Sequence, residues 1–209
     1  KLKTDSITQK HCASASDLQN LADLERQVRW LSSWTIHHAN YLRPNSGQIK
    51  VGGHQASCAS AVTLMTALYF YTLRSYDRVA VKPHASPVFH AIQYLLGNQS
   101  LKNLEAFRAF NGAQSYPSRT KDEDDVDFST GSVGLGPAMT LFTSMVQDYL
   151  RRHVKEKRNE NPGRMIALVG DAEMDEGNIY EALWEGWKHG LRNCWWIIDY
   201  NRQSLDGVV

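Results

Sequence analysis

RMIALVGDAE at residues 164–173 decides the fold, together with WWIIDYNRQ at residues 195–203. Each stretch begins as an apolar run of strand length and ends in polar residues. Between them, NIYEALWEGWKH at residues 178–189 carries its apolar residues on one face of a helix. A strand, a helix and a second strand in this order form a βαβ unit, whose two strands are parallel.

Asp171 and Asn201 stand where these two predicted strands end. Parallel strands end at the same edge of a sheet, and open α/β sheets bind ligands at that carboxyl edge. Carboxylate, amide and loop carbonyl oxygens suit Mg²⁺ or Ca²⁺, and Mg²⁺ is usually shared with a substrate phosphate. From the spacing alone, a helix cap at Asp171 and a turn at Asn201 are an equally good explanation.

Length, charge and cysteine content limit what kind of protein this can be. The 209 residues suffice for one large domain with a core. A formal net charge of +1, with no basic stripe interleaved with aromatic residues, argues against a nucleic-acid surface. Three scattered cysteines without CxxC spacing predict a reducing cytoplasm, and the polar amino end predicts no signal peptide.

Residues 51–73 contain no Asp, Glu, Lys or Arg and need to be checked against a membrane span. Only residues 59–73 are largely apolar, which is too short to cross a bilayer. We therefore expect a buried helix that begins near Ser57, and no membrane partner.

The rest of the chain reads as long helices with few strands. Residues 1–20 are expected to form a loose arm, and residues 21–40 an amphipathic helix. A short strand is expected at 79–82, a helix from there to 96, a short helix at 101–110 and a long helix at 138–155. Residues 114–128 are expected to form a charged, irregular loop, whose acidic run at 122–127 is interpreted as solvated.

The predicted domains are an N-terminal helical arm at 1–45 and an α/β domain at 46–209. A doubly wound sheet needs more strands than this order offers. The α/β domain is therefore expected to be incomplete at its C-terminus, as in a fragment, a split subunit or a proteolysed chain.

Gly131, Gly134 and Gly136 precede the long helix. Glycines let backbone N–H groups approach an anion, and a helix amino terminus adds positive potential. The spacing matches neither GxGxxG nor a P-loop. Close packing of the helix around Gly134 and Gly136 is the alternative explanation.

His54 and His84 each precede a predicted helix, in the same kind of position as Asp171. A neutral imidazole there can move protons or donate to a developing oxyanion near pH 7. A helix cap or a hydrogen-bonded core residue is the alternative. The remaining histidines within predicted helices are interpreted as structural; they are His37, His38, His90 and His153.

Four carboxylates crowd the turn after the first strand of the βαβ unit: Glu173, Asp175, Glu176 and Glu181. The dipole of a helix amino terminus favours such charges. Sharing of protons across a subunit interface is the alternative.

Several motifs together resemble a known family. GDA at 170–172, followed by Asn201, resembles the thiamine-diphosphate signature, which begins Gly-Asp-Gly and ends in Asn. GHQAS at 53–57, HASP at 84–87, TGSVGLG at 130–136, EMDE at 173–176 and NRQSLDG at 201–207 follow the order of the transketolase-like family. The resemblance extends from about Leu21 to Val209. SYP at 115–117, GLGP at 134–137 and the EMDE motif are most similar to the homodimeric bacterial pyruvate dehydrogenase component; transketolase itself is more distant.

The resemblance implies the thiamin-diphosphate-binding α/β fold, a parallel sheet flanked by helices on both faces. It implies thiamine diphosphate and Mg²⁺ as cofactors, with decarboxylation of a 2-oxo acid (pyruvate) and transfer of the acyl unit to a lipoyl carrier. The alternatives are transketolase-type ketol transfer between sugar phosphates and a non-catalytic partner subunit. The matched loops offer few Arg or Lys residues to anchor a sugar phosphate, which favours the oxo acid.

The same resemblance assigns roles to individual residues. Mg²⁺ would be held by the side chains of Asp171 and Asn201 and by the backbone carbonyl of Gln203. The diphosphate and thiazolium would be lined by Gly131, Val133, Gly170 and Ala172. The reacting carbon would be faced by His54, His84 and Tyr116. Glu176 and Glu181 would be the carboxylates that lie between the two active sites of a dimer.

Two features depart from the family pattern. Ala172 replaces the last glycine of the signature, which is acceptable only if its φ is negative. The glutamate that activates the aminopyrimidine comes, in this family, from a second domain that no segment of this chain matches. We therefore expect a pyrimidine-binding domain or subunit as partner and a homodimer or higher assembly, and we expect this chain alone to catalyse nothing.

Overall fold

The computed structural model describes residues 12–44, 49–154 and 163–204. Its centre is a parallel sheet in the order β1-β2-β3, formed by Arg78–Ala80, Met165–Gly170 and Cys194–Asp199. In the register, Ala80 pairs with Ala167, and Gly170 pairs with Asp199. The predicted βαβ unit is confirmed, because β2 and β3 are parallel and joined by α6 (Gly177–Lys188).

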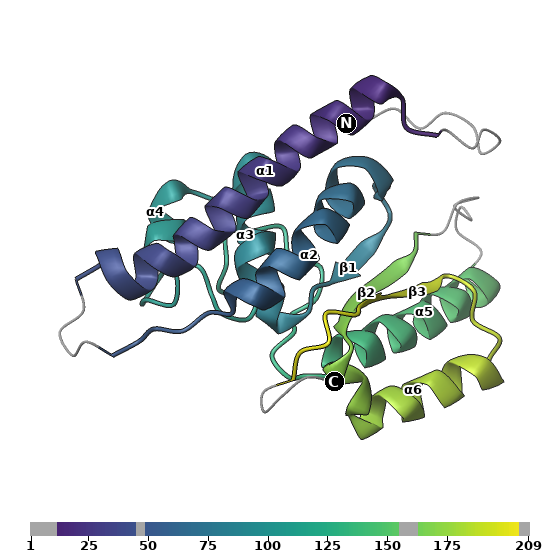
Figure 1. Cartoon of the computed structure of the whole chain (residues 1–209). Coiled ribbons are helices and arrows are strands. Elements are labelled where there is room, and N and C mark those ends of the chain that lie inside the picture. The colour runs from purple at the N-terminus through teal and green to yellow at the C-terminus, as the bar shows by residue number, and fades with distance from the viewer. Residues whose placement is uncertain (1–11, 45–48, 155–162, 205–209) are drawn as a thin grey trace.

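Helices cover both faces of the sheet (Figure 1). On one face lie α1 (Ala15–His37), α2 (Gln55–Ala67) and α3 (Ser86–Leu95), together with the short α4 (Leu101–Glu105). On the other face lie α5 (Leu135–His153) and α6. Short turns extend these helices: π-helical η1 (His38–Leu42) and η2 (Leu68–Thr72), and 3-10 helical η3 (Pro83–Ala85) and η4 (Ala172–Asp175). This arrangement is the expected α/β class.

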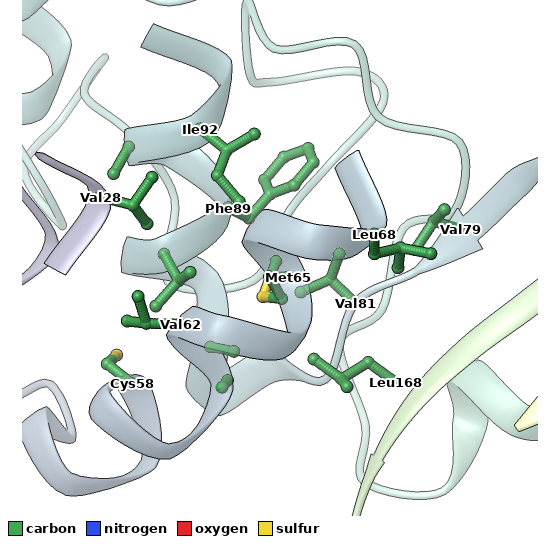
Figure 2. Packing of buried hydrophobic residues seen from close by; sticks show 14 of the residues in the cluster. Val28, Cys58, Val62, Met65, Leu68, Val79, Val81, Phe89, Ile92 and Leu168 are labelled. Atoms are coloured by element: carbon green, nitrogen blue, oxygen red, sulfur yellow. The ribbon is translucent and has the colours of Figure 1, made fainter. Parts of the chain in front are cut away.

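The larger core lies between the sheet and α1, α2 and α3. Figure 2 shows Met65 of α2 on the side of Phe89 of α3 and Leu168 of β2, with Val62 of α2 on the side of Val28. Val28 of α1 belongs to the same cluster. Alternate residues of β2 point to the opposite face, where Ala167 and Val169 pack with Ile179 of α6. Strand β2, buried on both faces, therefore needs its uninterrupted apolar sequence.

The first helix begins earlier than predicted. Ser14 and Asp17 form a capping box, in which the Ser14 hydroxyl accepts from the Asp17 amide at 3.1 Å. The part of the predicted loose arm from Ala15 to Asn20 is therefore helical, and residues 1–11 lie outside the described ranges. The capping pattern was present in the sequence and marks the correct start.

Two other predictions need correction. The helix expected at 101–110 ends at Glu105, since Arg108 and Asn111 have φ of 60° and 57°, in the left-handed region. The acidic run at 122–127 is not simply solvated. Asp124 is buried, and its Oδ2 accepts from the side chain of Gln99 at 2.8 Å and contacts Nδ1 of His90 at 2.6 Å.

The membrane question is answered for the described residues. None of the helices among them is both long enough and apolar enough to cross a bilayer. Helix α2 starts at Gln55, close to the predicted start, and it is buried on one face only: Leu64 on its other face is 38% exposed.

Candidate active site

The carboxyl ends of β2 and β3 bring Asp171 and Asn201 into one loop cluster. The amide of Asp171 donates to the carbonyl of Asp199 at 3.3 Å, and the Asp171 carboxylate accepts from the amide of Arg202 at 2.6 Å. Asn201 Oδ1 accepts from the amide of Gln203 at 3.0 Å. A carboxylate and an amide oxygen thus lie on two neighbouring loops at the carboxyl edge of the sheet, as the sequence predicts.

The alternative explanation of Asp171 as a cap applies to the 3-10 turn η4, whereas the N-cap residue of α6 is Glu176. Its Oδ1 accepts from the amide of Ala172 at 3.0 Å, which caps the 3-10 turn η4. A carboxylate oxygen has more than one acceptor site, so a cap does not prevent it from binding a cation. The donor set of Asp171, Asn201 and the backbone around Gln203 consists of oxygens, which fits a hard cation such as Mg²⁺.

Ala172 satisfies the condition set by the sequence. It lies in η4 and is not among the described non-glycine residues with positive φ. The methyl group therefore causes no backbone strain at this position. The replacement of the signature glycine does not disturb the turn.

The glycine turn before α5 has two different parts. Gly134 has a φ of 79°, and a Cβ there would lie 2.5 Å from Oδ1 of Asn178; a Cβ at Gly136 would lie 3.3 Å from that of Ala80. Both positions therefore serve close packing. A Cβ at Gly131, by contrast, would meet nothing within 4 Å, and Val133 is exposed. Gly131 and Val133 thus form the open part of the turn.

Glu173 joins this glycine turn to the end of β2. The carboxylate is buried, and it accepts from the amides of Gly134 at 2.7 Å and of Gly170 at 3.1 Å. Burial raises the pKa of this carboxyl, although the two amide hydrogen bonds oppose the shift. The amide of Gly170, expected to line a diphosphate, is therefore already bonded within the chain.

The other carboxylates of the turn are exposed. Glu176 is the N-cap residue of α6, and its Cβ lies beside Gly134. Glu181 lies within α6 and is also exposed. The expected group of charges at the amino terminus of α6 is thus reduced to Glu176, because Glu173 and Asp175 belong to η4 and Glu181 lies beyond the first turn of α6.

His54 and His84 form a pair of rings, with centroids 4.9 Å apart and planes at 62°. His54 is the N-cap residue of α2, and His84 lies in η3 directly after β1. Burial lowers the pKa of His84, and the charges of His54, Lys82 and Arg108 lower it further. His84 is therefore held in its neutral form near pH 7.

Tyr116 lies in the loop at 114–128 and is half exposed. Among the contacts of the described residues, none joins Tyr116 to the histidine pair. The structure thus brings two of the three residues expected at the reacting carbon together.

A buried network around Lys82, whose charge acts on His84, was missed by the sequence interpretation. Nζ of Lys82 lies 2.5 Å from Oδ2 of Asp199, and both side chains are buried. Ser60 Oγ donates to the same oxygen at 2.7 Å. Lys82 and Asp199 come from two different strand ends, 117 positions apart, so that no local pattern marks them as partners.

Comparisons with known proteins agree with this arrangement. Residues 50–209 match the family described as "Transketolase, thiamine diphosphate binding domain". The chain belongs to this family. The pyruvate dehydrogenase E1 component of Mycobacterium tuberculosis is 32% identical over 203 residues, which covers 90% of this chain and 21% of the relative. That of Escherichia coli K12 is 30% identical over 197 residues, covering 90% and 22%.

Solved structures support the fold of this thiamine diphosphate binding domain. Transketolase from Leishmania mexicana superposes with a TM-score of 0.75 at 19% identity, covering 95% of this chain and 29% of that one. A transketolase mutant from Pichia stipitis gives 0.71 at 18% identity, covering 90% and 28%. At such identities the likeness concerns the fold alone. The chain spans about a fifth of the length of the curated relatives.

Proposed function

We propose that this domain holds the diphosphate and Mg²⁺ of thiamine diphosphate in an enzyme that decarboxylates a 2-oxo acid, pyruvate, and passes the acyl unit to a lipoyl carrier. The observation that carries the proposal is the convergence of Asp171 and Asn201 at the carboxyl edge. Curated relatives named pyruvate dehydrogenase E1 component support the choice of substrate.

In this proposal the metal binds to the side chains of Asp171 and Asn201 and to the backbone carbonyl of Gln203. The open part of the glycine turn, Gly131 and Val133, faces the diphosphate, together with the backbone at Gly170 and Ala172. The amide of Gly170 donates to the carboxylate of Glu173, so Glu173 helps to fix the backbone at this position. Thiamine diphosphate supplies the carbanion that reacts with the oxo carbon.

His54 and His84 act on the protons of the substrate oxygen. The neutral form of His84 is available to donate or accept a proton near pH 7. The contact between the two rings lets a hydrogen bond at one histidine influence the other. Tyr116 is the third residue proposed at this position.

The proposed partners are a pyrimidine-binding domain or subunit and a second copy, in a homodimer or higher assembly whose active sites are linked through Glu176 and Glu181. Trp184 and Trp187 of α6 stack on each other with centroids 5.2 Å apart and are exposed in this chain. Large exposed apolar groups of this kind are typical of surfaces that meet another protein.

The proposed location is the cytoplasm, in keeping with three unpaired cysteines.

One observation favours ketol transfer between sugar phosphates as a second candidate. Lys50 and Arg108 line a hollow of about 470 Å³, together with Gln114 and Ser115 next to Tyr116. The guanidinium of Arg108 donates to the carbonyl of Val51 at 3.0 Å, and its charge acts on His84. The two cations of this hollow, one of which acts on His84, offer an anchor for a phosphate group that the sequence analysis did not predict.

The two candidates separate in one assay of the protein with its pyrimidine-binding part. The first predicts pyruvate-dependent reduction of an artificial electron acceptor, with little effect of Arg108→Met. Turnover of xylulose phosphate instead, with a raised KM in Arg108→Met, would establish the second. A non-catalytic partner subunit would show neither activity.

A further inference from the structure

The ion pair of Lys82 and Asp199 spans the carboxyl edge of the sheet. Lys82 follows β1 and Asp199 ends β3, so the pair passes over the end of β2, which lies between them. Two strands on either side of a central one are about 10 Å apart, and only a long side chain such as that of lysine can bridge this distance. The side chains are 4% and 6% exposed.

Such a pair is unlike an ordinary stabilising contact. Removing two charges from water costs about as much as their attraction returns, and well-packed apolar residues are often equally stabilising. The three groups that meet here come from α2, the β1–η3 junction and β3, the same segments that carry His54, His84 and Asn201. The position of the pair therefore points to a role in placing those residues.

The contacts of Asn201 show what is placed. Its Nδ2 donates to Ser60 Oγ at 3.3 Å and to Asp199 Oδ2 at 3.4 Å. An ionised carboxylate only accepts. The Ser60 hydroxyl proton goes to Asp199 at 2.7 Å, closer than the carbonyl of Ser57 at 3.2 Å, which leaves Ser60 Oγ as an acceptor for Asn201. Both neighbours thus require the nitrogen end of the amide.

The oxygen end of the same amide consequently faces the other way. Asn201 Oδ1 accepts from the amide of Gln203, in the loop whose Arg202 amide reaches Asp171. If the amide were rotated by 180°, its NH₂ group would face the cation. This group is a hydrogen-bond donor and cannot coordinate a metal ion. Asp199 and Ser60, held next to Lys82, thus take the nitrogen of Asn201 and leave its oxygen for the loop that reaches Asp171.

We propose that Lys82 and Asp199 are positioning residues of the metal site, which orient the Asn201 amide so that its oxygen serves Mg²⁺. The inference rests on the proposed function, since it assigns Asn201 to the metal. Both side chains are buried, and they act through their contacts with Ser60 and Asn201.

Two double variants test the inference in the protein with its pyrimidine-binding part. Lys82→Met with Asp199→Leu removes both charges and the acceptor. Lys82→Met with Asp199→Asn removes both charges but keeps an oxygen that can accept from Asn201. The readouts are the apparent Kd for Mg²⁺ at saturating thiamine diphosphate, by calorimetry, and the unfolding midpoint without ligands.

The Met/Leu variant should keep its unfolding midpoint but lose about tenfold in Mg²⁺ affinity, the scale of one misplaced hydrogen-bonding group. The Met/Asn variant should recover most of that loss. An unchanged Mg²⁺ affinity in the Met/Leu variant would overturn the inference. So would a parallel fall of midpoint and affinity that the Met/Asn variant does not correct, because a purely structural role predicts it.

Ser60→Ala keeps the ion pair and decides the question if the Met/Leu variant does not fold. A loss of about threefold in Mg²⁺ affinity supports the inference, and an unchanged affinity contradicts it. Lys188→Met with Glu185→Gln is the matched control, since it removes the same two charge types from the far end of α6 and should leave Mg²⁺ binding unchanged. Asp171→Ala tests the proposed function separately from the inference about Lys82 and Asp199. If this variant binds Mg²⁺ as tightly as the wild type, the proposed function fails, whatever the double variants show.

Discussion

Asp171 connects the two loops that follow β2 and β3. It caps η4 through the amide of Ala172, and it receives the amide of Arg202 from the loop after β3. The sequence predicts the meeting of Asp171 and Asn201, because parallel strands end at one edge. It does not predict Lys82 or Asp199, whose pairing depends on the three-dimensional order of the strands.

Gly134 should be intolerant of a side chain, whereas Gly131 should tolerate one. Gly134→Ala places a Cβ at a φ of 79° and 2.5 Å from Asn178, so we expect a loss of about 1–3 kcal/mol in the free energy of unfolding. Gly131→Ala meets nothing within 4 Å and should change it by less than about 0.5 kcal/mol. Equal losses in denaturant titrations of the two variants would contradict this view of the turn.

At the scale of elements, the long regular segments follow from the sequence and the loop at 114–128 does not. Strands β2 and β3 and helices α5 and α6 lie close to their predicted ranges, because apolar periodicity and the glycine turn mark them. The acidic loop looks solvated in the sequence. It is instead fastened to α3 by His90, whose Nε2 lies 2.7 Å from the carbonyl of Gln114.

The contact of His90 with Asp124 should make stability depend on pH. Burial alone would lower the pKa of His90, but the hydrogen bond and charge of Asp124 raise it above its ordinary value. The protonated pair therefore stabilises the fold fully below about pH 6.5, and this contribution is lost as pH rises through the folded-state pKa.

We expect the difference in unfolding free energy between the wild type and His90→Gln to shrink from about pH 6 to about pH 9. Chemical denaturation at several pH values measures it. His84 acts in the opposite direction, because its lowered pKa makes stability rise with pH, and the difference between the two proteins removes its effect. A difference that is constant or grows with pH would contradict the assignment.

At the scale of the whole molecule, the sheet is completed by helices on both faces, and one core unites α1 with the α/β layers. The predicted boundary at residue 45 stays a prediction, although Val28 and Ile36 of α1 share that core with α2 and α3. The chain spans about a fifth of the length of its curated relatives, and the exposed tryptophans of α6 are the surface at which we propose a contact with further protein.

Shortening a buried side chain should lower the free energy of unfolding more than shortening an exposed one. Leu168 of β2 is 2% exposed, so Leu168→Ala should cost about 2–5 kcal/mol. Leu64 lies on the outer face of α2, and Leu64→Ala should cost less than about 1 kcal/mol. Thermal or denaturant unfolding of the two variants checks the difference, and similar losses would place the core elsewhere.

We propose that Asp171 and Asn201 together hold the metal of thiamine diphosphate. Calorimetric titration of thiamine diphosphate and Mg²⁺ into the protein with its pyrimidine-binding part tests it most directly, with Glu185→Gln as a control on the distant end of α6. Asp171→Ala and Asn201→Ala should each weaken Mg²⁺-dependent binding by at least about tenfold, while the control binds like the wild type. Binding that neither alanine variant weakens would contradict the account.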